Sequence, residues 1–247
     1  MPSAAGGPQG EQFPATRLSV LTRIREGGEA ERREAFDLLA RAYWRPVYAY
    51  VRLRWRREPA DAEDLTQGFL GAAWAKSFFD AYDPARARFR TFLRVCLDRF
   101  VQNQWKAERT VKRGGGVPVL SLDFRNAEGA LAGREPVEPH GTETLFEREF
   151  SRSLFTGAVE RLRAELAARG RERVFTVFER YDLGPADEVT YAGLAAELGM
   201  PVTQVTNHLH TARRRFRELV LDQLRELSGS EEEFRAEARD LLGLDLE

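Results

Sequence analysis

The stretch Thr190–Leu219, TYAGLAAELGMPVTQVTNHLHTARRRFREL, places two helical patterns on either side of a glycine and a proline. Leu194 and Leu198 stand one helical turn apart in the first pattern. Gly199 supplies the permissive backbone that a sharp turn needs, and Pro201 suits the first position of the helix that follows. The spacing therefore predicts a short helix, a tight turn and a longer helix.

The second helix of this stretch has two chemically different faces. Its apolar face follows the spacing of a single buried stripe, with Val205, Leu209, Ala212 and Phe216. Its other face offers candidate DNA contacts, namely Thr203, Gln204, Thr206, Asn207, His210, Arg213 and Arg214. Short polar side chains followed by arginines are typical of a helix whose N-terminal residues contact base edges and whose later residues contact phosphates. The same pattern also fits ordinary packing, because amphipathic helices joined at a glycine occur in many all-α proteins.

Charge is segregated along the chain, although its total is nearly balanced. The 247 residues are 43% hydrophobic, which is enough for a core in each of two domains, and 31% charged with a formal net charge of −1. The chain is therefore not a general polyanion binder. Basic residues gather in 41–57, 86–113 and 213–217, and acidic residues in 135–149 and 226–247. This layout favours local basic surfaces for nucleic acid, with acidic segments held elsewhere or covering them.

Catalytic and metal-binding patterns are not recognisable in the sequence. Cys96 is the single cysteine, so Cys-based zinc sites and disulfides are excluded. His208 and His210 stand two apart on one helix and face different directions, and His140 lies in a presumed linker. We expect a non-enzyme without metal or cofactor. Because no signal peptide or membrane-length apolar run is present, we also expect a cytoplasmic protein without membrane contact.

The N-terminal half predicts a helical domain over 16–113, after a disordered segment 1–15. Aromatic residues interleave with arginines around Tyr48, Tyr50 and Trp55, which fits either a nucleic-acid surface or a core whose arginine stems reach outward. The next helix buries a stripe through Phe69 and presents an outward acidic face that becomes small around Gly68 and Gly71. This face suggests that another surface packs there.

The basic helix Phe89–Arg109 has apolar residues on one side and Arg94, Asp98, Gln102, Trp105 and Arg109 on the other. An outward tryptophan generally has a partner. Either an unpaired base or the domain's own first helices could provide it.

Beyond residue 113 the sequence predicts three further segments. Residues 114–144 lack a sustained period, are rich in Gly and Pro, and read as a linker whose apolar start docks on the protein. Residues 145–227 form a second helical domain, and 228–247 an acidic C-terminal helix. The expected fold is all-α, with two helical domains joined by a flexible linker and a helix-turn-helix at the end of the second.

Three motifs in this order resemble bacterial RNA polymerase sigma factors of the two-domain extracytoplasmic-function (ECF) type. They are DAEDLTQGFL (Asp61–Leu70), FRTFL with its helix (Phe89–Arg109), and the opening stretch from Tyr191 to Leu219. The passage Lys112–Asp123, with KRGGG and SLD, resembles a subgroup common in Planctomycetes. The resemblance covers nearly the whole chain after the first ten or so residues.

The resemblance implies three binding surfaces. The clamp helices of the polymerase largest subunit would be contacted by Asp61, Glu63, Asp64, Leu65 and Gln67. The −10 promoter element would be engaged and opened by the loop from Tyr82 and the helix after it, which would also trap a flipped base. The residues that would contact this element are Arg88, Arg90, Arg94, Asp98, Gln102, Trp105 and Arg109. The −35 element would be read in the major groove by the polar face of Val202–Arg217.

Further partners are also implied by the resemblance. The linker would run toward the RNA exit path, the polymerase flap would be contacted as well, and an anti-sigma factor or a regulatory kinase could control the protein. The chain departs from the family at Asp98 and Gln102, where Asn and Asp are frequent, and at His208, where Arg or Lys is frequent. The base-reading residues of the −10 helix therefore do not transfer directly, and His208 weakens phosphate contacts.

Two other functions fit the same sequence. A stand-alone helix-turn-helix regulator would use its N-terminal domain for ligand sensing or dimerisation, and would bind duplex DNA without polymerase. A polymerase-binding adaptor would bind core enzyme but fail to open promoters. We further expect that the acidic tail Ser230–Glu247 folds back on a basic helix and restrains DNA binding.

Overall fold

The computed structural model describes residues 19–75, 78–108, 122–131, 142–184 and 189–245. Within these ranges the secondary structure is helical and contains no strand, which confirms the all-α class. The elements are α1 Val20–Glu26, α2 Glu29–Arg54, α3 Pro59–Ala75, η1 Phe78–Ala81, α4 Phe89–Glu108, α5 Phe124–Leu131, α6 Thr142–Ala168, α7 Glu172–Phe178, η3 Glu179–Leu183, α8 Tyr191–Leu198, α9 Val202–Leu227 and α10 Glu231–Leu242. None of the helices in the described ranges is long and apolar enough to cross a membrane.

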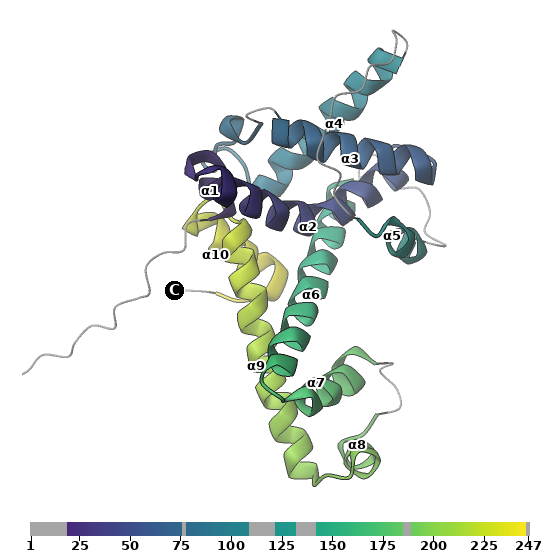
Figure 1. The fold of residues 1–247 in the computed structure, drawn as a ribbon, viewed down its shortest axis with the longest axis vertical. Coiled ribbons are helices and arrows are strands. Elements are labelled where there is room, and N and C mark those ends of the chain that lie inside the picture. The colour runs from purple at the N-terminus through teal and green to yellow at the C-terminus, as the bar shows by residue number, and fades with distance from the viewer. Residues whose placement is uncertain (1–18, 76–77, 109–121, 132–141, 185–188, 246–247) are drawn as a thin grey trace, which may run out of the picture.

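Helix α2 is the central element of the upper part of the molecule, where it lies against α1, α3, α5 and α6 (Figure 1). It is buried around much of its circumference, because Tyr43, Tyr48 and Tyr50 are each 2% exposed or less. The aromatic residues among the arginines therefore form core. The sequence alone does not distinguish a core from a nucleic-acid surface here. Arginines whose long stems reach outward from a core give the same pattern as arginines on a binding surface.

A helix forms inside the predicted linker. Residues 124–131 form α5, whose Phe124 ring lies edge-on to Trp44 at 5.4 Å and tilted against Tyr48 at 5.2 Å. Glu128 then accepts hydrogen bonds from the Tyr48 hydroxyl and from Arg52. The expectation that this segment lacks helical order is wrong at α5, because tertiary contacts with α2 stabilise a helix too short to be stable alone.

The lower part of the molecule is built on two long antiparallel helices, α6 and α9, with α7 and α8 at their far end (Figure 1). Gly170, at φ +64°, lets the chain reverse between α6 and α7. A small separate core fills this end, formed by Val177, Leu194, Ala195, Met200, Val205 and Leu209. The predicted buried stripe of the last long helix is confirmed at Val205, Leu209 and Ala212, each at most 1% exposed.

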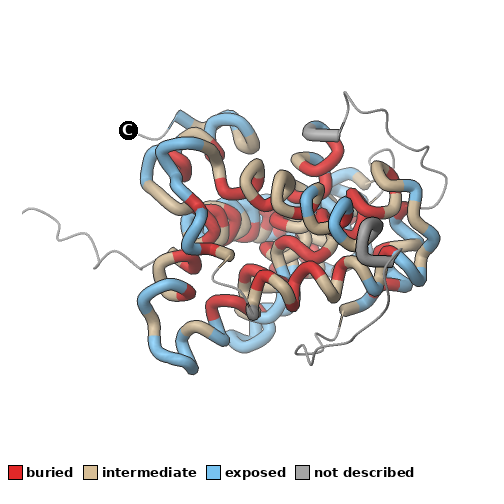
Figure 2. Tube along the Cα trace, turned by 90° about the horizontal axis from the view of Figure 1, so that it is seen from above, coloured by how far each residue is buried: buried red, intermediate tan, exposed pale blue. Residues whose placement is uncertain are grey.

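The main core is continuous across both predicted domains. Figure 2 shows buried segments running through the middle of the molecule, and one cluster of contacting apolar residues extends from Val20 to Ala238. At its centre the ring of Tyr43 on α2 stacks on Phe150 of α6 at 5.0 Å and meets Phe89 of α4 edge-on at 5.5 Å. The N-terminal and C-terminal helices are thus joined by aromatic packing in this conformation.

Candidate nucleic-acid interface

The turn between α8 and α9 is short and held from both sides. Thr190 begins α8 as its N-cap, and its hydroxyl accepts a hydrogen bond from the Gly193 N–H at 3.0 Å. Gly199 ends the helix at φ +60°, the left-handed region that glycine enters without steric cost. The Met200 N–H then donates to the Ala195 carbonyl at 3.0 Å, and Pro201 directly precedes α9. The angle between the two helices is therefore set by local chemistry.

The polar face at the start of α9 is open to solvent. Thr203, Gln204, Thr206, Asn207 and His210 are all exposed, while Val205 and Leu209 between them are buried. This arrangement presents amide, hydroxyl and imidazole groups on a rigid helix that is anchored from behind. Those are the groups that reach base edges in the major groove.

The basic segment 213–217 lies in the middle of α9, where Arg213 and Arg214 are both exposed but differ in their partners. Arg213 pairs with Asp182 through two hydrogen bonds of 2.7 and 2.9 Å, and its guanidinium lies 5.5 Å from the Tyr181 ring centroid. Arg215 pairs in the same two-bonded way with Glu165 of α6. Arg214 is exposed, and its one ion pair within the described part of the chain is with Glu218 of its own helix, at 3.8 Å. Arg214 is therefore the freer of the two predicted phosphate contacts, and Arg213 mainly fixes η3 against α9.

His208 differs from its exposed neighbours because it is half-buried. Burial lowers the pKa of its imidazole, and the nearby positive charges of Arg171 and Arg173 lower it further. The lowered pKa favours the neutral form of the imidazole. The departure noted in the sequence consequently removes a positive charge from this part of α9.

Helix α3 carries the predicted polymerase-contacting residues with different exposures. Asp61 and Asp64 are exposed, Glu63 and Gln67 are half-buried, and Leu65 packs against the main core. The small face at Gly68 receives the chain's own α4, because a Cβ added there would meet the Phe100 ring at 3.4 Å. The outward position predicted for Gly71 is wrong, because Gly71 is buried. The open part of this face is thus its acidic start.

Within α4, the middle residues are engaged with α2. Asp98 pairs with Arg94 at 3.8 Å and accepts hydrogen bonds from the Tyr50 hydroxyl at 3.1 Å and the Trp55 indole at 3.2 Å. Gln102 is exposed. The side chain of Trp105 and all of Arg109 lie outside the described residues.

The start of α4 is covered by the C-terminal helix. Arg90 is 5% exposed and pairs with Glu237 of α10 at 2.6 Å and with Glu147 of α6 at 3.0 Å. Arg88 pairs with Asp240 of α10 at 2.5 Å. Both arginines were predicted to contact the −10 element, and both are turned to carboxylates in this conformation.

The acidic tail lies on a basic helix, as the sequence predicts, but the sequence did not identify that helix as α4 or name the paired residues. Glu233, Glu237 and Asp240 follow one another at spacings of four and three, so they share one face of α10. That spacing was a readable signal of an acidic stripe. Its target was not readable, because Arg90 and Glu237 are 147 residues apart in sequence.

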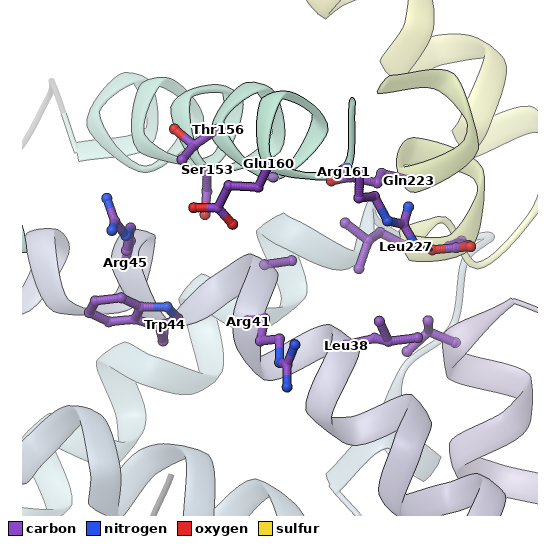
Figure 3. Close-up of a pocket in the computed structure, with 14 residues that line it drawn as sticks. Leu38, Arg41, Trp44, Arg45, Ser153, Thr156, Glu160, Arg161, Gln223 and Leu227 are labelled. Atoms are coloured by element: carbon purple, nitrogen blue, oxygen red, sulfur yellow. Dashed lines mark hydrogen bonds and ion pairs between the residues drawn. The ribbon is translucent and has the colours of Figure 1, made fainter. Parts of the chain in front are cut away.

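A cavity of about 260 Å³ lies between α2, α6 and α9, lined by side chains of both charge signs that include Arg41, Arg45 and Glu160 (Figure 3). It contains none of the predicted site residues. Among the described residues, no group of three His, Cys, Asp or Glu side chains could hold a metal ion.

Comparisons of the chain with protein-family models, with curated proteins and with solved structures give no match. Three surfaces are the candidate binding sites of this protein: the polar face of α9, the acidic start of α3 and the basic start of α4.

Proposed function

We propose that this protein is a sigma factor of the ECF type, a non-catalytic subunit that directs core RNA polymerase to promoter DNA in the cytoplasm. The observation that carries the proposal is the exposed polar face of α9, anchored by buried Val205 and Leu209 behind the tight turn at Gly199. In the proposal α8, this turn and α9 form a helix-turn-helix that reads the −35 element.

Separate surfaces support a polymerase subunit over a simple DNA binder. Helix α3 lies in the upper part of the molecule, and the start of α9 lies at its lower end (Figure 1). An exposed acidic patch at Asp61 and Asp64 repels DNA phosphates and attracts basic protein surfaces. We assign this patch to the clamp helices of the largest polymerase subunit, and the loop 82–90 with α4 to the −10 element.

The proposed function also treats 16–113 and 145–227 as two domains, each of which carries one DNA-contacting surface. Their separation on polymerase would require the aromatic contacts of Tyr43 with Phe150 to open. The linker 114–144 would then span the distance between them.

Reconstitution with core polymerase tests the proposal. Core enzyme alone and core enzyme with this chain are compared for binding and for transcription from promoters upstream of the chain's own operon. Promoter-specific transcripts that require the chain support the proposal. Absence of both polymerase binding and promoter-specific transcription would refute it.

Charge reversal on α3 tests the assigned polymerase surface. The double variant Asp61→Lys/Asp64→Lys is expected to lose core binding while keeping its helical content, since both side chains are exposed. Asp61→Lys alone is compared with Asp222→Lys as its matched control, because each reverses one exposed carboxylate, on α3 and on α9 respectively. Unchanged core binding in the double variant would remove these two residues from the interface.

A stand-alone helix-turn-helix regulator is the second candidate. It is favoured by the engagement of Arg88 and Arg90 with α6 and α10, which leaves the α9 face as the open DNA-contacting surface. Such a regulator binds duplex DNA tightly without polymerase. A gel-shift experiment with duplex promoter DNA, with and without core enzyme, distinguishes the two functions.

A further inference from the structure

We propose that the C-terminal helix α10 is an internal mask, which occupies the predicted −10-contacting loop of the free protein and must leave it before that loop can bind single-stranded DNA. The meaning of the masked surface rests on the proposed sigma function. The docking itself is independent of that assignment, because it follows from contacts between α10, the loop 82–90 and α4.

The first contact is a substitute helix cap. The Glu233 carboxylate accepts hydrogen bonds from the Tyr82 hydroxyl at 2.7 Å and from the Phe89 N–H at 2.5 Å, at the first residue of α4. A carboxylate at a helix N-terminus satisfies a free backbone donor and interacts favourably with the helix dipole. Phe89 belongs to the main core, but Tyr82, at 4% exposed, is held by its hydrogen bond to α10. The Tyr82 ring is therefore unavailable for stacking on a base.

The second contact neutralises the basic residues of the loop. Glu237 pairs with Arg90, and Asp240 pairs with Arg88. Arginine side chains supply the phosphate contacts on which DNA affinity depends. Carboxylates placed on both guanidinium groups occupy the positions that phosphate oxygens would take.

The third contact is steric, and it is independent of charge. The chain enters α10 through Gly229, where an added Cβ would stand 2.6 Å from a ring carbon of Tyr82. Tyr82 is buried and its hydroxyl is bonded to Glu233, so the ring cannot easily move aside. The approach of the tail to the loop thus depends on the absence of a side chain at 229.

The docked state has a free-energy cost at Arg90 that favours release of α10. Arg90 Nε is buried without a hydrogen-bond partner among the described residues. A buried unsatisfied donor on a charged group opposes docking, and it is relieved when the arginine returns to water. The ion pairs between α10 and the loop are therefore opposed by this cost, which favours release of α10.

Two variants of the full-length chain open the mask by different routes. Glu237→Lys reverses the charge facing Arg90, and Gly229→Ala places a methyl group against the Tyr82 ring. Glu232→Lys is the matched control, because it makes the same charge change on the exposed side of α10. Circular dichroism establishes that each variant retains its helical content.

Two measurements are made on each protein without polymerase. Hydrogen exchange followed by mass spectrometry reports the opening of residues 82–93. Fluorescence anisotropy reports the binding of a short labelled single-stranded DNA of mixed sequence. We expect both opening variants to exchange faster and to bind the DNA about tenfold more tightly, because apparent affinity scales with the fraction of open molecules. The control should match the wild type in both measurements.

Other outcomes overturn the proposal. Faster exchange without tighter DNA binding makes α10 a purely structural helix, and unchanged exchange in both opening variants shows that these contacts do not hold it. An equal gain in the Glu232→Lys control assigns the effect to net charge. The proposed sigma function fails separately if the chain does not bind core polymerase. The mask proposal stands in that case if the opening variants still bind the DNA more tightly.

Discussion

Glu237 makes the stability of this protein depend on pH near neutrality. Burial raises the pKa of its carboxyl from the ordinary 4.5 to about 7. Arg90 and Arg88 oppose this shift, while Glu233 and Asp240 add to it. Three carboxylates, Glu237, Asp240 and Glu147, pair with the two guanidinium groups, and Glu237 itself is buried, so an upward shift of its pKa is the expected direction.

The sign of the effect follows from proton linkage. A carboxyl whose pKa is raised in the folded state binds its proton more tightly there than in the unfolded chain. Its contribution favours the folded, docked state at low pH, and that contribution is lost as the pH rises through about 7. Between about pH 6 and about pH 8 the loss amounts to about 1.3 kcal/mol, which is close to tenfold in an equilibrium constant.

The comparison of wild type with Glu237→Gln isolates this contribution. Glutamine keeps the shape of the protonated side chain but does not titrate. Urea unfolding of both proteins, followed by circular dichroism across this pH range, gives two stability curves. We expect the wild type to lose about 1.3 kcal/mol relative to the variant from about pH 6 to about pH 8. A constant difference between the two curves, or a wild type that gains stability with pH, would refute the argument.

Other predictions concern the turn, the DNA face and the core. Gly199→Ala should destabilise the fold by about 1–2 kcal/mol in urea unfolding, because its φ is +60°. Gly129→Ala, at an exposed helical position in open space, should instead stabilise by up to about 1 kcal/mol. Arg214→Ala should lower the salt slope of duplex binding by about 1, whereas Asn207→Ala should relax base preference at constant slope. Tyr43→Ala should cost about 3–5 kcal/mol in the same unfolding assay, and an unchanged stability would contradict the central place of Tyr43 in the continuous core.

The local spacing of residues was sufficient to predict the structure wherever a helix has one apolar face and a clear end. The turn at Gly199, the stripe through Val205 and Leu209, and the break before α10 all follow from residues within a few positions of one another. The exposed polar face of α9 was predictable for the same reason, since the opposite side of a buried stripe must face solvent.

Contacts between distant segments were not encoded in any local pattern. Helix α5 was hidden by its Gly- and Pro-rich surroundings, and it is stabilised by the packing of Phe124 on Trp44. The pattern around Tyr48 and Tyr50 fits either a nucleic-acid surface or a core. The surrounding helices bury both residues and so make them core.

The sequence by itself determined the helices, their apolar faces and the chemistry that each polar face can offer. Only the tertiary structure decided which of those faces remain open. Arg90 has the same basic character in the sequence as Arg214, yet it is 5% exposed while Arg214 faces solvent. The physical reason is that a charged side chain can be buried when distant carboxylates compensate it. The folded chain brings Glu147 and Glu237 to Arg90, so the partner and not the residue decides its exposure.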